Sequence, residues 1–355
     1  MSVLRKTHEI IDDLLSAIDS AQNEILLQIF YIDNDEVFSR FVEKMIEKSI
    51  AGIRVYCLVD ALGAGQLAVR GVEKRLKDAG VRVEYFNWLT PWKRGNKKFW
   101  YFRNHKRSLI IDNKVMHLGG WCIGEKTQDW IEAHIVTRDI DAVQAGATDF
   151  WNMYKYSHKT QLKFSHQKKF LYTSSSNIAY TYQAPLLKSR FIYYTHKKLV
   201  QNTQNRIVLI TPYFSPIHGL IHAGYEARKR GVSIDIYIPE KTDHHFVDLV
   251  AKTYIHKLLK AGANVYLSKT MIHAKVCLFD NTAYIGTMNL DTISLRYNFE
   301  NGLFTRQKET ITELEQDLII LQSQCEKIDL VEWEKRMTWF QKLLGRVMKV
   351  LRPFV

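Results

Sequence analysis

The sequence contains no long hydrophobic run. Its longest apolar stretches, such as Ile207 to Ile210, are too short to cross a lipid bilayer. The first residues do not resemble a secretory signal peptide, because Arg5, Lys6, His8 and Glu9 interrupt any apolar stretch. We therefore expect neither a membrane-spanning segment nor a cleaved leader.

Cysteine is scarce as well. The chain has four cysteines in 355 residues, mostly in or beside apolar, strand-like segments (Cys57, Cys122, Cys277 and Cys325). This distribution predicts reduced, mostly buried thiols in a cytoplasmic setting. No spacing of cysteine and histidine is typical of a zinc site, and no cofactor is expected.

Basic residues are in clear excess, with 50 Lys and Arg against 37 Asp and Glu and a net charge of +13. Such a charge implies an anionic partner, which includes nucleic acid, an acidic membrane surface and phosphorylated substrates. The composition, with 46% hydrophobic and 25% charged residues, is ordinary for a globular protein. The length allows one large core or two domains.

Predicted helices and strands alternate through the first third of the chain. Apolar residues at helical spacing are followed repeatedly by short apolar runs that open after a glycine or a turn. The expected order is helix Thr7–Gln22, strand Ile25–Ile32, a helix from Glu36 to about Ala51, strand Ile53–Val59, helix Leu67–Ala79 and strand Val81–Phe86. This alternation predicts βαβ units and a mostly parallel sheet.

The segment from Met271 to Gly302 carries the first sign of chemistry. His273 and Lys275 are two residues apart on a predicted strand, so their side chains point to the same face. Lys275 would neutralise phosphate charge, Thr287 and Asn289 would donate hydrogen bonds, and His273 would be nucleophile or proton donor. A histidine and a lysine at this spacing also occur by chance in an ordinary buried strand.

A second copy of the pattern makes chance a poor explanation. His105 is followed by a cation two residues later and an aspartate seven residues later, as is His273. The segments around the two copies also repeat, since Ile207–Ile210 parallels Ile25–Ile29. We therefore expect an α/β fold of two similar halves, each a mostly parallel sheet flanked by helices, with one active site at their interface.

The duplicated pattern resembles the H-x-K-x4-D motif of the phospholipase D superfamily, and the chain resembles bacterial cardiolipin synthases from about Thr7 onward. The second copy matches fully, whereas Arg107 stands where the family has lysine. The paired residues are His105, Arg107 and Asp112 in the first copy and His273, Lys275 and Asp280 in the second. Further matching stretches are Leu27–Phe30, Arg103–His105, Thr211–Phe214, Asn289–Asp291 and Asn298–Glu300.

The resemblance implies phosphodiester exchange through a phosphohistidine, without a metal. One neutral histidine attacks phosphorus and the other protonates the leaving alkoxide; the first-motif His105 is often the nucleophile, and His273 stays an alternative. The remaining candidates are Arg107 and Lys275 as cations, Glu132 and Glu300 to orient the imidazoles, Asp112 and Asp280 at the strand ends in a more structural role, and Asn289, Thr287, Gly120 and Arg103 as substrate ligands.

Several positions depart from the family pattern. Cys122 stands where cardiolipin synthases usually have asparagine, and Glu125 and Glu132 replace shorter carboxylates. Arg107 keeps the charge of the lysine but differs from it in size and shape. These changes leave open a weak or inactive enzyme.

Three segments lie outside the repeated pattern. Trp88 to Arg103 mixes aromatic and basic residues, which suits the rim of a site for an anionic amphiphile or single-stranded nucleic acid, or else a packed surface loop. Residues 331–355 form a basic amphipathic segment for a membrane interface, or a final helix with a solvated basic face. The expected division is 1–160 for the first half, 161–190 for the connection, 191–330 for the second half and 331–355 for this segment.

The leading functional hypothesis is a phosphatidyltransferase of the cardiolipin synthase type. Its expected partners are an anionic phospholipid membrane and a phospholipid substrate, and its expected location is the inner, cytoplasmic face of the membrane as a peripheral protein. The alternatives are a phospholipase D-type hydrolase, a nuclease, and a catalytically weak protein that binds membranes or nucleic acid.

Overall fold

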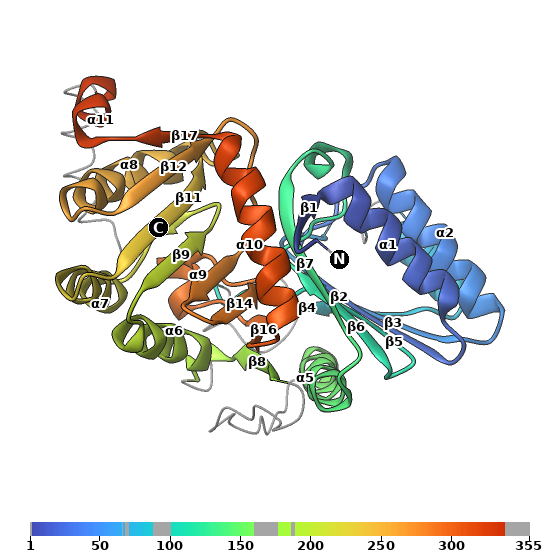
Figure 1. Ribbon diagram of the computed structural model, residues 1–355. Coiled ribbons are helices and arrows are strands. Elements are labelled where there is room, and N and C mark those ends of the chain that lie inside the picture. Colours follow the sequence, from blue (N-terminus) through green and yellow to red (C-terminus); the bar gives the residue numbers. More distant parts are fainter. Residues whose placement is uncertain are drawn as a thin grey trace.

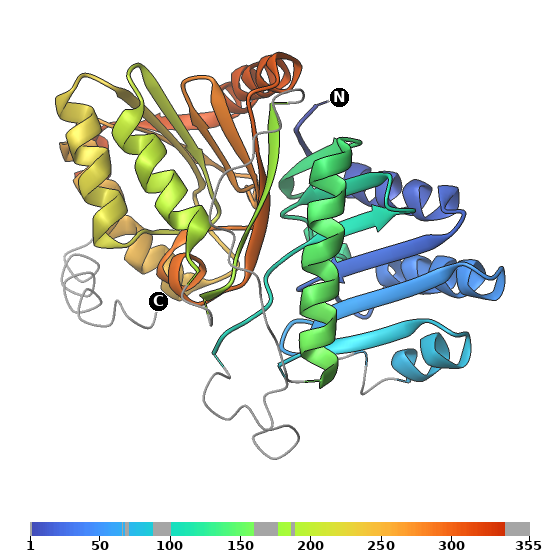
Figure 2. The ribbon, with the colours of Figure 1, turned by 90° about the horizontal axis from the view of Figure 1, so that it is seen from below.

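The computed structural model describes residues 2–65, 67, 71–87, 101–159, 177–185 and 189–337. Most of the aromatic-basic segment 88–103, most of the connection and all of the C-terminal segment after Met337 lie outside these residues. Two halves stand side by side, each built on one twisted sheet, with helices on the outer face of each sheet (Figures 1 and 2).

The first half contains a seven-stranded sheet in the order β1-β7-β6-β5-β2-β3-β4. Its helices follow from simple sequence features. The buried face of α1 consists of apolar residues at helical spacing, from Ile10 to Ile18. Asp35 caps the N-terminus of α2, where its side chain accepts a hydrogen bond from the backbone NH of Phe38 at 3.1 Å. The elements are β1 (Leu4–Lys6), α1 (Thr7–Ser20), β2 (Glu24–Ile29), α2 (Glu36–Ile50), β3 (Arg54–Asp60), α4 (Val72–Asp78), β4 (Arg82–Phe86), β5 (Ser108–Ile111), β6 (Val115–Gly119), the 3-10 turn Glu125–Thr127, β7 (Ile131–Thr137) and α5 (Ile140–Lys159).

The second half contains an eight-stranded sheet in the order β17-β12-β11-β9-β13-β14-β16-β8. A short pair, β10 with β15, lies beside it. The elements are β8 (Ile178–Gln183), α6 (Phe191–Asn202), β9 (Arg206–Ile210), β10 (Phe214–Ser215), α7 (His218–Lys229), β11 (Ser233–Pro239), α8 (His245–Lys260), β12 (Asn264–Ser268), β13 (Val276–Phe279), β14 (Thr282–Gly286), β15 (Leu290–Asp291), α9 (Thr292–Arg296), β16 (Glu300–Thr305), α10 (Lys308–Ser323), β17 (Cys325–Ile328) and α11 (Leu330–Arg336).

The expected pair of similar halves is confirmed by the strand orders. The run β7-β6-β5-β2-β3-β4 of the first sheet has the same order and directions as β16-β14-β13-β9-β11-β12 of the second. The sheets are mixed, however, and not mostly parallel. Within the two large sheets, only β2-β3-β4 and β9-β11-β12 pair in parallel among the described strands, because each motif-bearing strand folds back as an antiparallel hairpin.

One expected helix and one expected boundary differ from the structure. Leu67 is helical as expected, but Gly71 has a φ of +74° and caps a separate helix, α4, from Val72 to Asp78. The strand β8 lies inside the expected connection 161–190 but pairs with β16, so the second sheet begins before residue 191. The other expected domain limits stay predictions.

The two sheets share one core. Side chains on the facing surfaces of both sheets, such as Leu26, Leu118, Val208 and Ile285, form one buried apolar cluster together with α5 and α10. The outer faces have separate clusters under their own helices. A shared inner core fixes the halves against each other, which is what a site at their interface needs. None of the helices within the described ranges is both long and apolar enough to span a membrane.

The motif aspartates lie far from the interface. Asp112 follows β5 and Asp280 follows β13, at the strand ends opposite the histidines, and both have a positive φ. Each carboxylate accepts hydrogen bonds from three consecutive backbone NH groups, those of residues 22–24 and 204–206, at 2.7–3.0 Å. These bonds lower the pKa of both carboxyls although burial opposes them. These contacts favour the structural role expected for both aspartates over a catalytic one.

Replacing Asp280 with alanine should reduce stability and leave chemistry almost intact. The variant loses three charge-assisted hydrogen bonds that hold the turn before β9, so we expect the free energy of unfolding to fall by about 1–3 kcal/mol. Urea unfolding and initial rates at a permissive temperature measure the two effects. Asp112→Ala is the matched variant in the other half, and a large rate loss at unchanged stability would contradict the structural role.

Candidate active site

The backbone of each histidine segment forms hydrogen bonds with residues at the start of a strand in the opposite half. The backbone NH of His105 donates to the carbonyl of Phe299 at 2.9 Å, and the NH of Phe299 donates to Arg103 at 2.8 Å. Likewise, the NH of His273 donates to Ile131 at 2.8 Å. Phe299 and Ile131 each precede a glutamate. The crossed pairing therefore places a glutamate of each half beside the histidine of the other.

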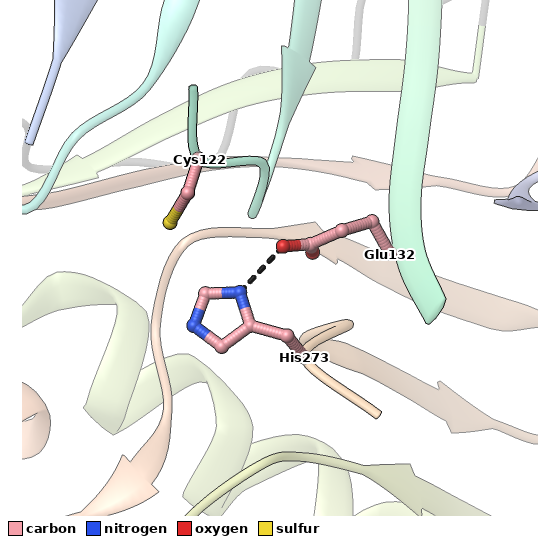
Figure 3. Close-up of side chains that lie close together, drawn as sticks. All are labelled: Cys122, Glu132 and His273. Atoms are coloured by element: carbon pink, nitrogen blue, oxygen red, sulfur yellow. Dashed lines mark hydrogen bonds and ion pairs between the residues drawn. The ribbon is translucent and has the colours of Figure 1, made fainter. Parts of the chain in front are cut away.

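The side chains complete this exchange. The Nδ1 atom of His105 lies 2.9 Å from both carboxylate oxygens of Glu300, and the Nδ1 atom of His273 lies 2.5 Å from Oε1 of Glu132 (Figure 3). All four side chains are buried. Each imidazole is thus fixed in orientation by a carboxylate, and each of these two pairs combines a histidine of one half with a glutamate of the other.

Two buried cations lie next to these histidines. Nη1 of Arg107 is 3.1 Å from Nε2 of His105, and Nζ of Lys275 donates to the backbone carbonyl of His273. A guanidinium only donates, so Nε2 of His105 is the acceptor and the ring proton sits on Nδ1, facing Glu300. Both cations are 1% exposed. Buried charges of this kind bind a phosphate strongly, because water does not screen them.

The surroundings hold both histidines neutral in the free protein. Burial, followed by the charges of Arg107 and Lys275, places the pKa of His105 well below its ordinary value. Burial lowers the pKa of His273 to about 4, although the carboxylate of Glu132 opposes this shift. Burial also lowers the pKa of Lys275 to about 8.

The two glutamates differ in charge state. Burial alone raises the pKa of Glu132, but the charges of His273 and Lys275 outweigh it, so this pKa is lowered. For Glu300 burial dominates and raises the pKa to about 8, against the hydrogen bond from Thr287. His273 therefore faces the more strongly ionised partner and is the better site for a proton, whereas His105 is the better free lone pair.

Comparison with known proteins supports the same grouping. The family described as cardiolipin synthase, PLD-like domain, matches residues 14–154 and 197–320, which include both histidine segments. The chain belongs to this family. It is an enzyme of the phospholipase D superfamily, in the phosphatidyltransferase or phosphodiesterase class.

Curated relatives of this phospholipase D-like enzyme match over most of the chain. The major cardiolipin synthase of Bacillus subtilis is 31% identical over 360 residues, covering 96% of this chain and 72% of the relative. The cardiolipin synthase of Listeria monocytogenes is 28% identical over 362 residues, covering 98% and 74%. That of Clostridium perfringens is 26% identical over 345 residues, covering 93% and 71%.

Solved structures agree on the fold of the phospholipase D-like enzyme. Phosphatidylserine synthase from Haemophilus influenzae superposes with a TM-score of 0.76 at 12% identity, covering all of this chain and 97% of that chain. Polyphosphate kinase from Porphyromonas gingivalis gives 0.60 at 13% identity, covering 90% of this chain and 50% of that one. At these identities the likeness concerns the arrangement of helices and strands alone.

Two expected substrate ligands of the phospholipase D-like enzyme have other partners. The guanidinium of Arg103 forms a buried ion pair with Asp60, with Nε 3.0 Å from Oδ1. The hydroxyl of Thr287 donates to Glu300 at 2.6 Å and so supports the carboxylate that orients His105. These contacts give both side chains a structural partner, and their binding to substrate stays a prediction. The Oδ1 atom of Asn289 is buried without a hydrogen-bond partner among the described residues, but an amide oxygen accepts, so the expected donation from Asn289 to phosphate stays a prediction.

A buried network of hydrogen-bonded polar side chains next to His105 was not predicted from the sequence. Lys106 forms hydrogen bonds of 2.7 Å to both oxygens of Asp149 in α5, and Asp149 accepts another from Tyr180 in β8. Tyr180 accepts from Asn301, whose Oδ1 accepts the backbone NH of Arg107 at 3.3 Å. This network connects the first histidine motif to strands β8 and β16 of the second sheet. Its one sequence signal was the lysine directly between His105 and Arg107.

Gly120 was expected as a substrate ligand, and the structure shows why no side chain fits there. A Cβ atom at this position would lie 2.8 Å from Oε2 of Glu132 and 2.9 Å from Cδ of Lys275. We expect Gly120→Ala to fold but to lose about 10²-fold in rate, because it displaces two groups of the site. Gly224→Ala in α7 is the control, since its Cβ meets nothing closer than 3.9 Å. Equal rates for the two variants would contradict this.

Proposed function

We propose that the protein is a phosphatidyltransferase of the cardiolipin synthase type that acts through a phosphohistidine intermediate. One observation carries the proposal: two buried imidazoles, each held by a carboxylate of the other half, lie beside two buried cations. A phosphodiester bound between them would meet a nucleophile, a proton donor and charge compensation together. The catalytic roles of all these residues are part of the proposal.

In the first step, His105 is the nucleophile. Its Nε2 lone pair leaves Nη1 of Arg107 and attacks phosphorus, forming an N–P bond while the bond to the leaving alcohol oxygen breaks. The guanidinium then binds a phosphoryl oxygen, and Lys275 compensates charge on the same group. His273, whose pKa rises when it faces an anionic phosphodiester, gives its proton to the leaving alkoxide.

The second step reverses these roles. His273, now neutral, removes the proton from the hydroxyl of the acceptor alcohol. The alcohol oxygen attacks phosphorus, the N–P bond breaks, and His105 regains its lone pair. Glu300 and Glu132 keep both rings in place throughout. No step in this sequence consumes a cofactor.

The choice of lipid substrates rests on the relatives and on charge. The relatives from Bacillus, Listeria and Clostridium are named cardiolipin synthases, and the structural neighbour from Haemophilus is a phosphatidylserine synthase. A net charge of +13 favours binding to an anionic phospholipid surface. We therefore propose phosphatidylglycerol as both donor and acceptor, with the protein peripheral at the inner, cytoplasmic face of the membrane. The four cysteines are free thiols, in keeping with that location.

The test uses purified protein and phosphatidylglycerol vesicles, with lipid products identified by mass spectrometry. Cardiolipin and glycerol from the parent, and neither from His273→Ala, are the expected result. Phosphatidic acid in place of cardiolipin would mean that the enzyme hydrolyses the phosphodiester and does not transfer the phosphatidyl group to an alcohol. The absence of any lipid product, together with salt-dependent cleavage of DNA or RNA, would overturn the proposal in favour of a nuclease, which the same positive charge also suits.

A further inference from the structure

Three side chains of different chemical type meet on one side of the site. Sγ of Cys122, a nitrogen of His273 and a carboxylate oxygen of Glu132 all lie within 4.8 Å of one another (Figure 3). Thiolate, imidazole and carboxylate are the ligand types that zinc takes in proteins, and three protein ligands leave a fourth position open. The cysteine is unusual, because the cardiolipin synthases that this chain resembles usually have asparagine there.

We propose that Cys122, Glu132 and His273 bind one thiophilic divalent ion of the zinc class, and that this ion inhibits the enzyme. The inhibition rests on the proposed function, whereas the binding does not. The inference adds a regulatory ligand to a reaction that proceeds without it.

Glu132 supplies an independent reason to expect a ligand. Its Oε1 atom accepts the hydrogen bond from His273, but its Oε2 atom is buried and has no hydrogen-bond partner among the described residues. The side chain is 0% exposed. A buried carboxylate oxygen without a partner is energetically costly, and a metal ion bound there would remove that cost.

Binding an ion requires a local adjustment of the three ligands. Bonds of about 2.0–2.3 Å to a tetrahedral zinc ion place ligand atoms about 3.3–3.8 Å apart. The three ligand atoms lie within 4.8 Å of one another, and His273 and Glu132 are held by a hydrogen bond of 2.5 Å, so binding requires that this bond open while Sγ of Cys122 stays close. The backbone around Cys122 is fixed, since Trp121 and Ile123 on either side are fully buried.

The charges balance on binding. The ion displaces the thiol proton, which leaves to solvent, and takes a lone pair of the neutral imidazole, so two anionic ligands offset its two positive charges. Burial raises the pKa of the Cys122 thiol, and Arg107, whose Nη2 lies 3.5 Å from Sγ, opposes this shift in part. Arg107 and Lys275 also repel the incoming ion, so the site should bind less tightly than a structural zinc site, which suits reversible inhibition.

Inhibition follows from the identity of the ligands. An imidazole lone pair bound to a metal ion can neither accept a proton from the acceptor alcohol nor carry one to the leaving group. The carboxylate that orients this imidazole is held by the same ion. One bound ion therefore removes the proposed acid–base group and its positioning partner together.

Binding is tested directly with Co²⁺ on the metal-free full-length protein. A cobalt–thiolate bond gives a charge-transfer absorption in the near ultraviolet, which does not depend on catalysis. We expect the absorption in the parent, with loss in Cys122→Asn and Cys122→Ser and a clear weakening in His273→Ala. Cys325→Ser is the matched control, because Cys325 is the one partly exposed cysteine. Near-ultraviolet circular dichroism verifies that each variant is folded.

Two results would overturn the site. One is the absence of thiolate absorption in the parent at millimolar Co²⁺, and the other is absorption that disappears in Cys325→Ser but persists in Cys122→Asn. Inhibition is tested with Zn²⁺ in the vesicle assay. The zinc concentration that gives half-inhibition should be at least about 10-fold higher for Cys122→Asn than for the parent. Equal sensitivity would refute inhibition through this site. Cobalt binding without lipid turnover would sink the proposed function and leave the metal site standing.

Discussion

Replacing His105 with alanine is expected to lower phosphatidyl transfer by about 10⁴-fold or more and to abolish the covalent enzyme intermediate. The variant lacks the Nε2 lone pair, next to Nη1 of Arg107, that would attack phosphorus. Rapid quenching with denaturant at alkaline pH, which preserves the acid-labile N–P bond, followed by mass spectrometry of the protein, measures the phosphatidyl adduct. Glu300→Gln should keep the adduct but form it more slowly, because it weakens orientation and leaves the nucleophile in place.

His273→Ala should behave differently from His105→Ala when the leaving group is changed. With phosphatidylglycerol we expect a loss of about 10²–10⁴-fold, the usual range for a missing acid–base group. With a p-nitrophenyl phosphodiester, whose leaving group needs no proton, His273→Ala should still form the adduct on His105. If the adduct instead persists in His105→Ala and is lost in His273→Ala, the two histidines have the opposite roles.

The crossed pairing explains why the positions of the histidines could be predicted from the sequence and their partners only in part. A cation two residues after a histidine, repeated in two copies, is a local pattern that survives in any fold. Glu132 and Glu300 came from resemblance alone. Nothing local indicates that each glutamate serves the histidine of the other half, since this depends on backbone pairing between Phe299 and His105 across the interface.

Buried charges were the least predictable part of the site. Lys106 and Asp149 are 43 residues apart, and they meet because α5 packs between β4 and β8. Arg103 and Asp60 are also 43 residues apart, and Asp60 both pairs with Arg103 and accepts the backbone NH of Asn104, the residue before His105. A charged residue next to a motif is equally compatible with substrate binding and with structural pairing until its tertiary partner is known.

The mixed pairing of the sheets has a similar cause. Strands of parallel βαβ units and strands of hairpins have the same sequence pattern, a short apolar run, when both faces of the sheet are covered. The pattern therefore does not distinguish parallel from antiparallel pairing. The hairpins β5-β6 and β13-β14 are marked by turns at Asp112-Asn113 and Asp280-Asn281, where both aspartates adopt a positive φ. A tight turn between two adjacent strands implies an antiparallel hairpin, and these two hairpins make both sheets mixed. This hairpin arrangement places both histidines at the same end of their sheets, facing the interface.

Lys275→Ala should lower the rate of transfer by about 10²–10³-fold, the effect typical of losing one group that stabilises charge in the transition state. Lys275 is 1% exposed, so water cannot replace the missing charge. Stopped assays over a range of phosphatidylglycerol concentrations separate kcat from KM, and most of the loss should be in kcat. Lys241→Ala, at the end of β11, is the control for a general loss of positive charge. An equal effect of both substitutions would contradict a specific role.

The pH profile gives the sharper test of the same residue. The pKa of Lys275 is lowered to about 8, so the side chain is charged below that pH and becomes neutral as the pH rises through it. If the charge is needed, kcat/KM should fall on the alkaline side with an apparent pKa of about 8. Lys275→Arg should retain part of the activity and move this fall upward by at least about one pH unit, because arginine stays charged. Glu300 also has a pKa of about 8. A fall that remains at pH 8 in Lys275→Arg would therefore assign the titration to the His105–Glu300 pair and remove the charge argument for Lys275.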